Sequence, residues 1–184
     1  MSVSHIALAV FVTVLWGFTF VVMRDLLDML PPFLMATVRV VAAGLPILVL
    51  MRLPKTPFYW LLLLGLTQGA AQMALLLFGM EFGMPAGLSA LVLQTQVLFT
   101  TGLAFMILGE KPRWAQYTGI AISLVGMVVI ASTMPGGATI IGFFFVILAA
   151  LTWAGSNIIV KLAGTDEVMR LVAWAHVIGI LPLL

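Results

Sequence analysis

The sequence predicts an all-α, polytopic membrane helix bundle. Of its 184 residues, 64% are hydrophobic and 8% are charged, and the mean hydropathy is +1.27. A soluble domain needs charges on roughly a quarter of its residues to cover its surface. A chain with so few charges cannot face water over most of its surface. The lipid bilayer is therefore its expected solvent and its first predicted partner.

Seven apolar runs divide the chain, and most are long enough to cross about 30 Å of hydrocarbon. They cover residues 5–23, 31–51, 58–79, 85–108, 113–132, 140–160 and 168–184. Short segments with proline, glycine and charged residues separate them. Backbone polar groups in lipid must be satisfied within their own segment, so each run is predicted to be a helix. No linker indicates a second, soluble domain.

The loop cations predict the orientation of these helices. If the N-terminus is cytoplasmic, the outer loops hold only Arg24, and the inner loops hold Arg52, Lys55, Lys111, Arg113, Lys161 and Arg170. This positive-inside bias predicts a multi-pass protein of the plasma (bacterial inner) membrane with a cytoplasmic N-terminus. The bias also argues against two copies inserted in opposite orientations, although a homodimer is a possible assembly.

Several classes of partner are excluded by the inventory of side chains. The cations are scattered singly, without the basic stripe that tracks phosphates, so we expect no nucleic acid partner. The chain has no cysteine and only two, distant histidines, which predicts no metal site. The pattern G-x-x-x-x-G-K-[ST] is absent, so no nucleotide-binding loop is expected. No cofactor is predicted.

An internal repeat relates the first helix to the sixth. WGFTFVVMR at 16–24 aligns with WAGSNIIVK at 153–161, an offset of 137 residues, and the same offset places Arg39 on His176. Five helices fit within one repeat, and because five is odd the second copy must cross the membrane upside down. We therefore predict inverted five-helix repeats. Residues 1–133 would form the first repeat, and residues 138–184 would begin the second, which is truncated in its second helix.

A resemblance to a known family rests on WGFTFVVMR, Arg39, GMPAGLSALVLQTQ at 83–96, GEKP at 109–112 and WAGSN at 153–157. These segments resemble the EamA-like exporters of the drug/metabolite transporter superfamily. The third of these is similar to the O-acetylserine/cysteine exporter branch. The chain departs from the family pattern at Thr19, where asparagine is common, and at Arg24, where lysine is common.

The resemblance implies a function and a length. It implies a secondary transporter, not an enzyme, which exports small polar metabolites such as amino acids or their derivatives by alternating access. Members of the family have ten helices, so a chain with seven would be a fragment. A non-functional truncated membrane protein is an alternative.

Polar residues in the apolar runs are the candidate substrate-binding residues. Gln68 and Gln72 lie four residues apart on one helical face and would line a cavity or join helices. Gln94 and Gln96 point about 200° apart, so one is expected to face the translocation path and the other a neighbouring helix. We favour Gln94 for the path, with both as interhelical contacts as the alternative. Gly65 and Gly69 predict close helix packing.

Two ionisable residues lie inside the predicted helices. Arg39 must meet water, a cluster of carbonyl groups or an anion, and is a candidate for binding a substrate carboxylate. A fixed contact with carbonyl groups is the alternative. His176 is a candidate for proton coupling because histidine changes its charge near neutral pH. A hydrogen-bonded packing role is its alternative.

The first helix of each repeat contributes the remaining candidates for substrate binding. Inverted repeats place equivalent helices around a central site, so we expect Trp16, Thr19, Trp153 and Asn157 to line that site. A position at the membrane interface is the usual alternative for tryptophan.

An intramembrane serine protease is a contrasting hypothesis. GLSA around Ser89 and AHVIG around His176 resemble the serine and histidine segments of rhomboid proteases. A Ser–His dyad supports acyl transfer if the two side chains lie within hydrogen-bond reach.

Overall fold

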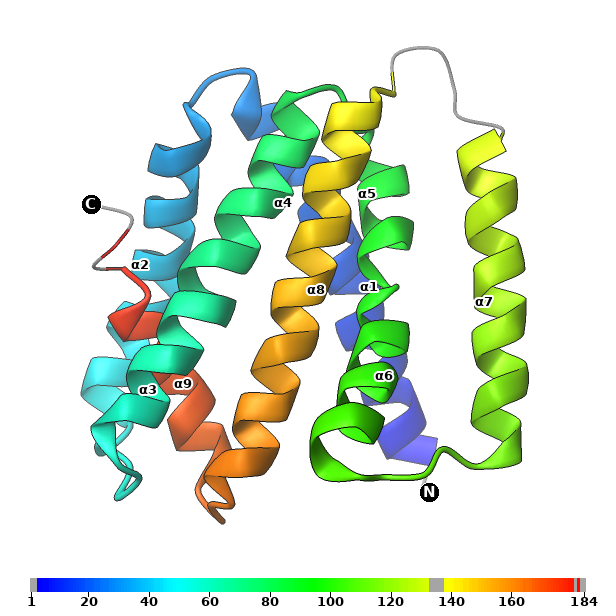
Figure 1. Cartoon of the computed structure of the whole chain (residues 1–184). Helices are drawn as coiled ribbons and strands as arrows, with labels where there is room; N and C mark the ends of the chain where they lie inside the picture. The colour runs from blue at the N-terminus through cyan, green and yellow to red at the C-terminus, as the bar shows by residue number, and fades with distance from the viewer. Residues whose placement is uncertain (1–2, 133–137, 181, 183–184) are drawn as a thin grey trace.

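The computed structural model describes residues 3–132, 138–180 and 182, and within them the chain forms helices packed side by side (Figure 1). This confirms the all-α bundle. The helices are α1 (Val3–Leu27), α2 (Pro32–Leu50), α3 (Phe58–Leu64), η1 (Gly65–Ala71), α4 (Gln72–Glu81), α5 (Ala86–Leu93), α6 (Gln96–Leu108), α7 (Trp114–Ser132), α8 (Ile140–Ala163) and α9 (Val168–Ile178).

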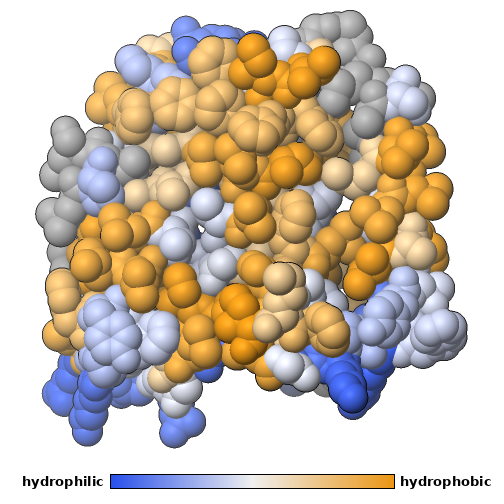
Figure 2. All heavy atoms as spheres, viewed as in Figure 1, coloured by the Kyte–Doolittle hydropathy of each residue, from blue (hydrophilic) through white to orange (hydrophobic). Residues whose placement is uncertain are grey.

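Four helical segments in the described part of the chain are long and apolar enough to cross a membrane. They span residues 4–27, 58–81, 86–108 and 140–163, and shorter apolar helices span 32–42, 114–129 and 168–178. Figure 2 shows hydrophobic side chains over most of the visible face, with hydrophilic residues gathered toward its upper and lower edges. This distribution is the one that lipid around the bundle requires.

Helices α1 and α8 run in opposite directions (Figure 1). The N-terminus of α1 lies at the end of the bundle where α8 finishes, and α8 begins at the end where α1 finishes. The first helices of the two predicted repeats therefore have the antiparallel relation that inversion requires. Four of the six inner cations lie in the loops 51–57 and 109–113, and the other two, Lys161 and Arg170, lie in the last turn of α8 and the first turn of α9. These loops and helix ends lie at the same end of the bundle as the N-terminus (Figure 1).

Two apolar runs that the sequence predicts as single helices change their winding partway along. Between α3 and α4, residues 65–71 form a π-helical turn, which is a wider winding than the α-helix. Between α5 and α6, the N–H groups of Gln94 and Thr95 bond to the carbonyls of Leu91 and Val92, three residues back. The Thr95 hydroxyl also donates to the Val92 carbonyl at 2.7 Å, which favours this tighter turn.

Helix α8 packs closely against α4 through glycine. A Cβ built on Gly142 would lie 2.7 Å from the Gly79 carbonyl oxygen, so only glycine fits there. The buried core surrounds this contact and includes Leu77 of α4, Val92 of α5 and Val146 of α8. Close backbone approach at small residues is the usual way in which helices associate in lipid.

Helix α9 packs against α2, α3 and η1. A Cβ on Gly65 would lie 2.8 Å from the Ala175 carbonyl oxygen, and a Cβ on Gly69 would lie 3.0 Å from Cα of Gly179. The predicted packing role of Gly65 and Gly69 is therefore confirmed. The contact holds His176, the neighbour of Ala175, close to the π-helical turn.

The loop between α2 and α3 is bonded to α9 and to the residue that precedes it. The Trp174 indole N–H lies 3.2 Å from the Met51 carbonyl and 3.1 Å from that of Arg52. The Lys55 backbone N–H donates to the Glu167 carboxylate at 2.8 Å. That hydrogen bond, together with the Arg170 guanidinium beside it, lowers the pKa of Glu167.

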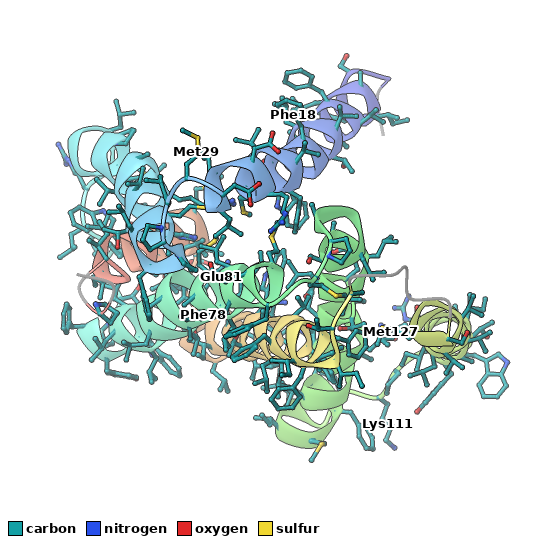
Figure 3. All side chains as sticks on the ribbon, turned by 90° about the horizontal axis from the view of Figure 1, so that it is seen from above. Phe18, Met29, Phe78, Glu81, Lys111 and Met127 are labelled. Atoms are coloured by element: carbon teal, nitrogen blue, oxygen red, sulfur yellow. The ribbon has the colours of Figure 1, made fainter. Side chains whose placement is uncertain are left out.

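Helix α7 stands apart from the other helices. In the view from above it lies beside the bundle, with Met127 directed toward it (Figure 3). Met127 lines a pocket of about 180 Å³ with Gln94 and Thr95, at the junction of α5 and α6.

Candidate functional site

A cavity of about 150 Å³ lies between the helices of the bundle. It is lined by Trp16, Phe20 and Met23 of α1, Arg39 of α2, Gln68 of η1, Gln72, Met73 and Leu76 of α4, Leu93 of α5, Trp153 of α8 and His176 of α9. Six of the nine residues proposed from the sequence for substrate binding or proton coupling therefore lie around one space. These six are Trp16, Arg39, Gln68, Gln72, Trp153 and His176.

The two tryptophans of the internal repeat form part of the cavity wall and contact each other. Their ring centroids lie 5.2 Å apart and their planes meet at 69°, an edge-to-face arrangement. Trp16 is on α1 and Trp153 is on α8, the two antiparallel first helices. The repeat-related residues Arg39 and His176 line the same cavity.

Arg39 lines the cavity, and its guanidinium group contacts an uncharged side chain. One of its guanidinium nitrogens, Nη1, lies 2.9 Å from the Met23 sulfur. A thioether is a weak acceptor and carries no charge, so this contact places no negative charge beside the guanidinium group of Arg39. The predicted alternative, a tie to carbonyl groups at a helix end, is not the contact that the structure gives.

The two glutamines of the third apolar run reach the same cavity from two kinds of helix. Gln68 lies in the π-helical turn, and Gln72 is the first residue of α4 and is 7% exposed. Each amide group offers donors and an acceptor without a formal charge. Together they supply the neutral polar groups of the cavity wall.

His176 lies in the cavity wall with one ring nitrogen already bonded. Its Nδ1 lies 2.8 Å from the Val172 carbonyl oxygen, one turn earlier in α9. A carbonyl oxygen can only accept, so this geometry assigns the proton to Nδ1 and leaves Nε2 for other partners.

Asn157 and Gln96 join two helices and do not line this cavity. The Asn157 amide nitrogen lies 3.0 Å from Gln96 Oε1 and 3.0 Å from the Thr100 hydroxyl oxygen. The prediction that one glutamine of this run bonds to a neighbouring helix therefore describes Gln96. The expectation that Asn157 lines the central site does not agree with this geometry, because its amide is turned toward α6.

Gln94 and Thr19 do not line the cavity that contains Gln68 and Gln72. Gln94 is exposed and lines a neighbouring pocket of about 210 Å³ that shares Trp16, Phe20 and Leu93 with the cavity. Thr19 bonds to the Leu15 carbonyl of its own helix. It lines a mostly apolar pocket of about 240 Å³ that shares Met23 and Arg39 with the cavity. The structure therefore separates both residues from the glutamine pair.

The apolar residues of the cavity wall were not found from the sequence. The residue types of four of them are common in this apolar chain, so the sequence does not distinguish them from other core residues: Phe20, Met73, Leu76 and Leu93. Met23 is one of twelve methionines and nothing in the sequence marks it as the partner of Arg39. Only its position sixteen residues before Arg39, across the turn between α1 and α2, brings the two together.

The geometry gives no support to the serine protease. Ser89 is fully buried and its hydroxyl donates to the Met84 carbonyl at 3.5 Å. Ser89 is not among the residues that line the cavity with His176. Among the described hydrogen bonds, none joins the two side chains.

The fold and the cavity define a multi-pass membrane protein with a cavity between its helices that holds several polar side chains. The EamA-like transporter family matches residues 3–132, and the chain belongs to this family. It is 38% identical to a probable amino-acid metabolite efflux pump of Salmonella typhimurium over 96% of this chain and 61% of that protein. The protein of Escherichia coli with the same description is 37% identical over 99% of this chain and 63% of its own length.

A more distant relative is described as an inner membrane transporter. The uncharacterized inner membrane transporter YedA of Escherichia coli is 30% identical over 79% of this chain and 49% of its own length. The chain thus spans about three fifths of the length of the two efflux pumps that it resembles. No solved structure matches it.

Proposed function

We propose that this chain belongs to a secondary transporter that exports small polar metabolites, amino acids or their derivatives, across a bacterial inner membrane. The observation that carries the proposal is the meeting of Arg39, Gln68 and Gln72 in one cavity beside the Trp16–Trp153 pair. A guanidinium group and two amides are suited to the carboxylate and the neutral polar groups of such a metabolite. The printed descriptions of the two efflux pumps support the same class of substrate.

Alternating access around this cavity is the proposed mechanism. The cavity lies between α1 and α8, which run in opposite directions, and inverted repeats that rock against each other expose a central site to each side in turn. The tight turn at Gln94 and Thr95 supports a moving part, since short 3₁₀ stretches within helices often mark hinges. His176 stays our candidate for coupling the movement to protons.

The proposed orientation has the N-terminus in the cytoplasm. It is supported by the six cations in the loops and helix ends at the N-terminal end of the bundle. The Lys161 ammonium group also contacts the Glu110 carboxylate at 2.7 Å at that end, and so links the end of α8 to the loop after α6.

Efflux from vesicles tests the proposal. The purified chain is reconstituted into liposomes loaded with radiolabelled O-acetylserine or N-acetylserine, and release is compared with that from protein-free liposomes. Gln72→Leu, which removes a polar group from the cavity, should reduce release about tenfold. Gln116→Leu, in the exposed first turn of α7, is the matched control and should leave release unchanged. Release no faster than from protein-free liposomes would contradict transport by this chain.

A further inference from the structure

The charges around the cavity all have the same sign. Arg39 and His176 are the two ionisable groups among the described residues that line it. The six carboxylate side chains of the protein lie in loops or in the last turns of helices, at Asp25, Asp28, Glu81, Glu110, Asp166 and Glu167. The cavity wall therefore holds no negative charge against Arg39.

The partner of Arg39 makes this imbalance stronger. The Met23 thioether occupies one of the five N–H donors of the guanidinium group and adds no charge. The remaining donors have the planar, forked geometry that fits a carboxylate with two parallel hydrogen bonds. An anion in the cavity would thus be held by both charge and geometry.

His176 cannot supply a counter-charge. Its Nδ1–H donates to the Val172 carbonyl, so the ring is neutral when Nε2 is bare and positive when Nε2 is protonated. In both states the cavity is electropositive. Gln68 and Gln72 are neutral in every state and match a neutral acyl or amide group.

The tryptophan pair is the feature of the cavity that attracts cations. The face of an indole ring attracts an ammonium group, but this attraction is weaker than the repulsion from an unpaired guanidinium charge in the same low-dielectric space. The net preference of the cavity is therefore set by Arg39.

We infer that the cavity selects metabolites with a free carboxylate and no net positive charge, and that N-acylated amino acids fit it better than free amino acids or amines without a carboxylate. The inference rests on the proposed function, because it names the charge class of the substrate bound at the same site. The carboxylate binds Arg39, and the acyl amide bonds to Gln68 and Gln72.

Three related ligands that differ in charge test the inference. N-acetylserine carries one negative charge and serine is a zwitterion. Serinol, in which a hydroxymethyl group replaces the carboxylate of serine, carries one positive charge. Binding to the purified 184-residue chain in detergent is measured by calorimetry at pH 8. We expect affinity to fall in that order, with at least a tenfold difference between N-acetylserine and serinol.

Variants show whether Arg39 causes the order. Arg39→Gln should bring the affinities of N-acetylserine and serinol to within about twofold of each other, whereas Arg39→Lys should keep part of the preference. Arg113→Gln removes the same charge from an exposed loop and should leave the preference intact. If Arg39→Gln does not fold, the preference of Arg39→Lys and the order of ligand affinities on the unmodified chain still test the charge selectivity.

The outcomes separate this inference from the function on which it rests. Binding of serinol as tightly as N-acetylserine, or an unchanged preference in Arg39→Gln, would overturn the charge selectivity while the exporter stands. If none of the three ligands binds, both the proposed function and this inference are overturned.

Discussion

Trp16 and Trp153 lie 137 residues apart in the chain and meet edge to face, with ring centroids 5.2 Å apart. Each is the tryptophan that opens the repeated segment of its helix. Arg39 and His176, related by the same offset, line the cavity beside them. Two pairs of equivalent positions therefore meet at the place where α1 passes α8, which is where the inverted repeat predicts a central site.

The tryptophan pair should contribute to ligand affinity. Trp16→Phe or Trp153→Phe removes part of an edge-to-face contact, worth about 0.5–1.5 kcal/mol beyond its buried area, and reshapes the cavity wall. We expect the affinity for N-acetylserine to fall about three- to tenfold, measured by calorimetry. Trp114→Phe is the control, because Trp114 is 83% exposed on α7. Equal effects at Trp114 and Trp153 would contradict a role for the pair in binding.

The Asn157–Gln96 hydrogen bond should stabilise the bundle without taking part in binding. Asn157→Leu leaves the Gln96 amide without its partner on α8, and interhelical hydrogen bonds in membranes are worth about 0.6 to 1.7 kcal/mol. We expect a loss of about 1 kcal/mol in the free energy of unfolding, measured by denaturant titration in micelles. The double variant with Gln96→Leu should recover part of the loss, because both polar partners are then gone. Strictly additive losses would show that the two residues do not interact.

Much of the site was predictable because polar residues are rare in this chain. A charge or an amide in lipid must find a partner or an aqueous space, so Arg39, Gln68 and Gln72 are expected to point inward for a physical reason. The repeat pairs Trp16 with Trp153 because tryptophan is a rare residue whose recurrence at a fixed offset stands out in an apolar sequence. Both predictions therefore depend on residues that are uncommon in lipid-facing helices.

The remaining parts of the site depend on how helices rotate against their neighbours. Asn157 lies four residues after Trp153 and so on the same face of α8, but farther along the helix its neighbour is α6, and it bonds to Gln96 there. The π-helical turn at residues 65–71 packs against the end of α9. Apolar residues have little preference between an α-helical and a π-helical winding, so the helix that packs against them determines which winding forms. The local sequence does not show which helix that is.

The contact between Gly142 and Gly79 should be sensitive to a single methyl group. Gly142→Ala would place Cβ 2.7 Å from the Gly79 carbonyl oxygen and 3.1 Å from the Met84 nitrogen. Overpacking of this kind costs about 1–3 kcal/mol, because α4 and α8 must separate. We expect the melting temperature in detergent to fall.

Gly155 on the same helix is the matched control. A Cβ there meets no atom within 4 Å, and alanine favours a helix over glycine by up to about 1 kcal/mol. Gly155→Ala should therefore leave stability unchanged or raise it. A Gly142→Ala variant as stable as Gly155→Ala would contradict the close packing of α4 and α8.

His176 should make binding of an anionic ligand depend on pH. A proton taken up by Nε2 would add a positive charge beside the guanidinium group of Arg39. The carboxylate of N-acetylserine stays ionised from pH 8 to pH 6, so its affinity should rise several-fold over that range. His176→Gln should flatten this profile and leave the affinity at pH 8 within about twofold. The same rise in the variant would exclude His176 from the response and from proton coupling.

Charge selectivity predicts that transport responds to membrane potential. An empty cavity carries the positive charge of Arg39, and a cavity loaded with a monoanion is neutral, so each cycle moves one net charge. One elementary charge corresponds to about a tenfold accumulation for each 60 mV, on the positive side. In liposomes clamped by potassium gradients and valinomycin, N-acetylserine should therefore accumulate on the positive side, whichever way the protein is inserted. A cavity loaded with serine carries the same charge as the empty cavity, so no net charge moves in a cycle and the accumulation of serine should not change with potential. A flux of N-acetylserine that is independent of potential would show that another charge moves with it in each cycle, and a proton on His176 is then the first candidate.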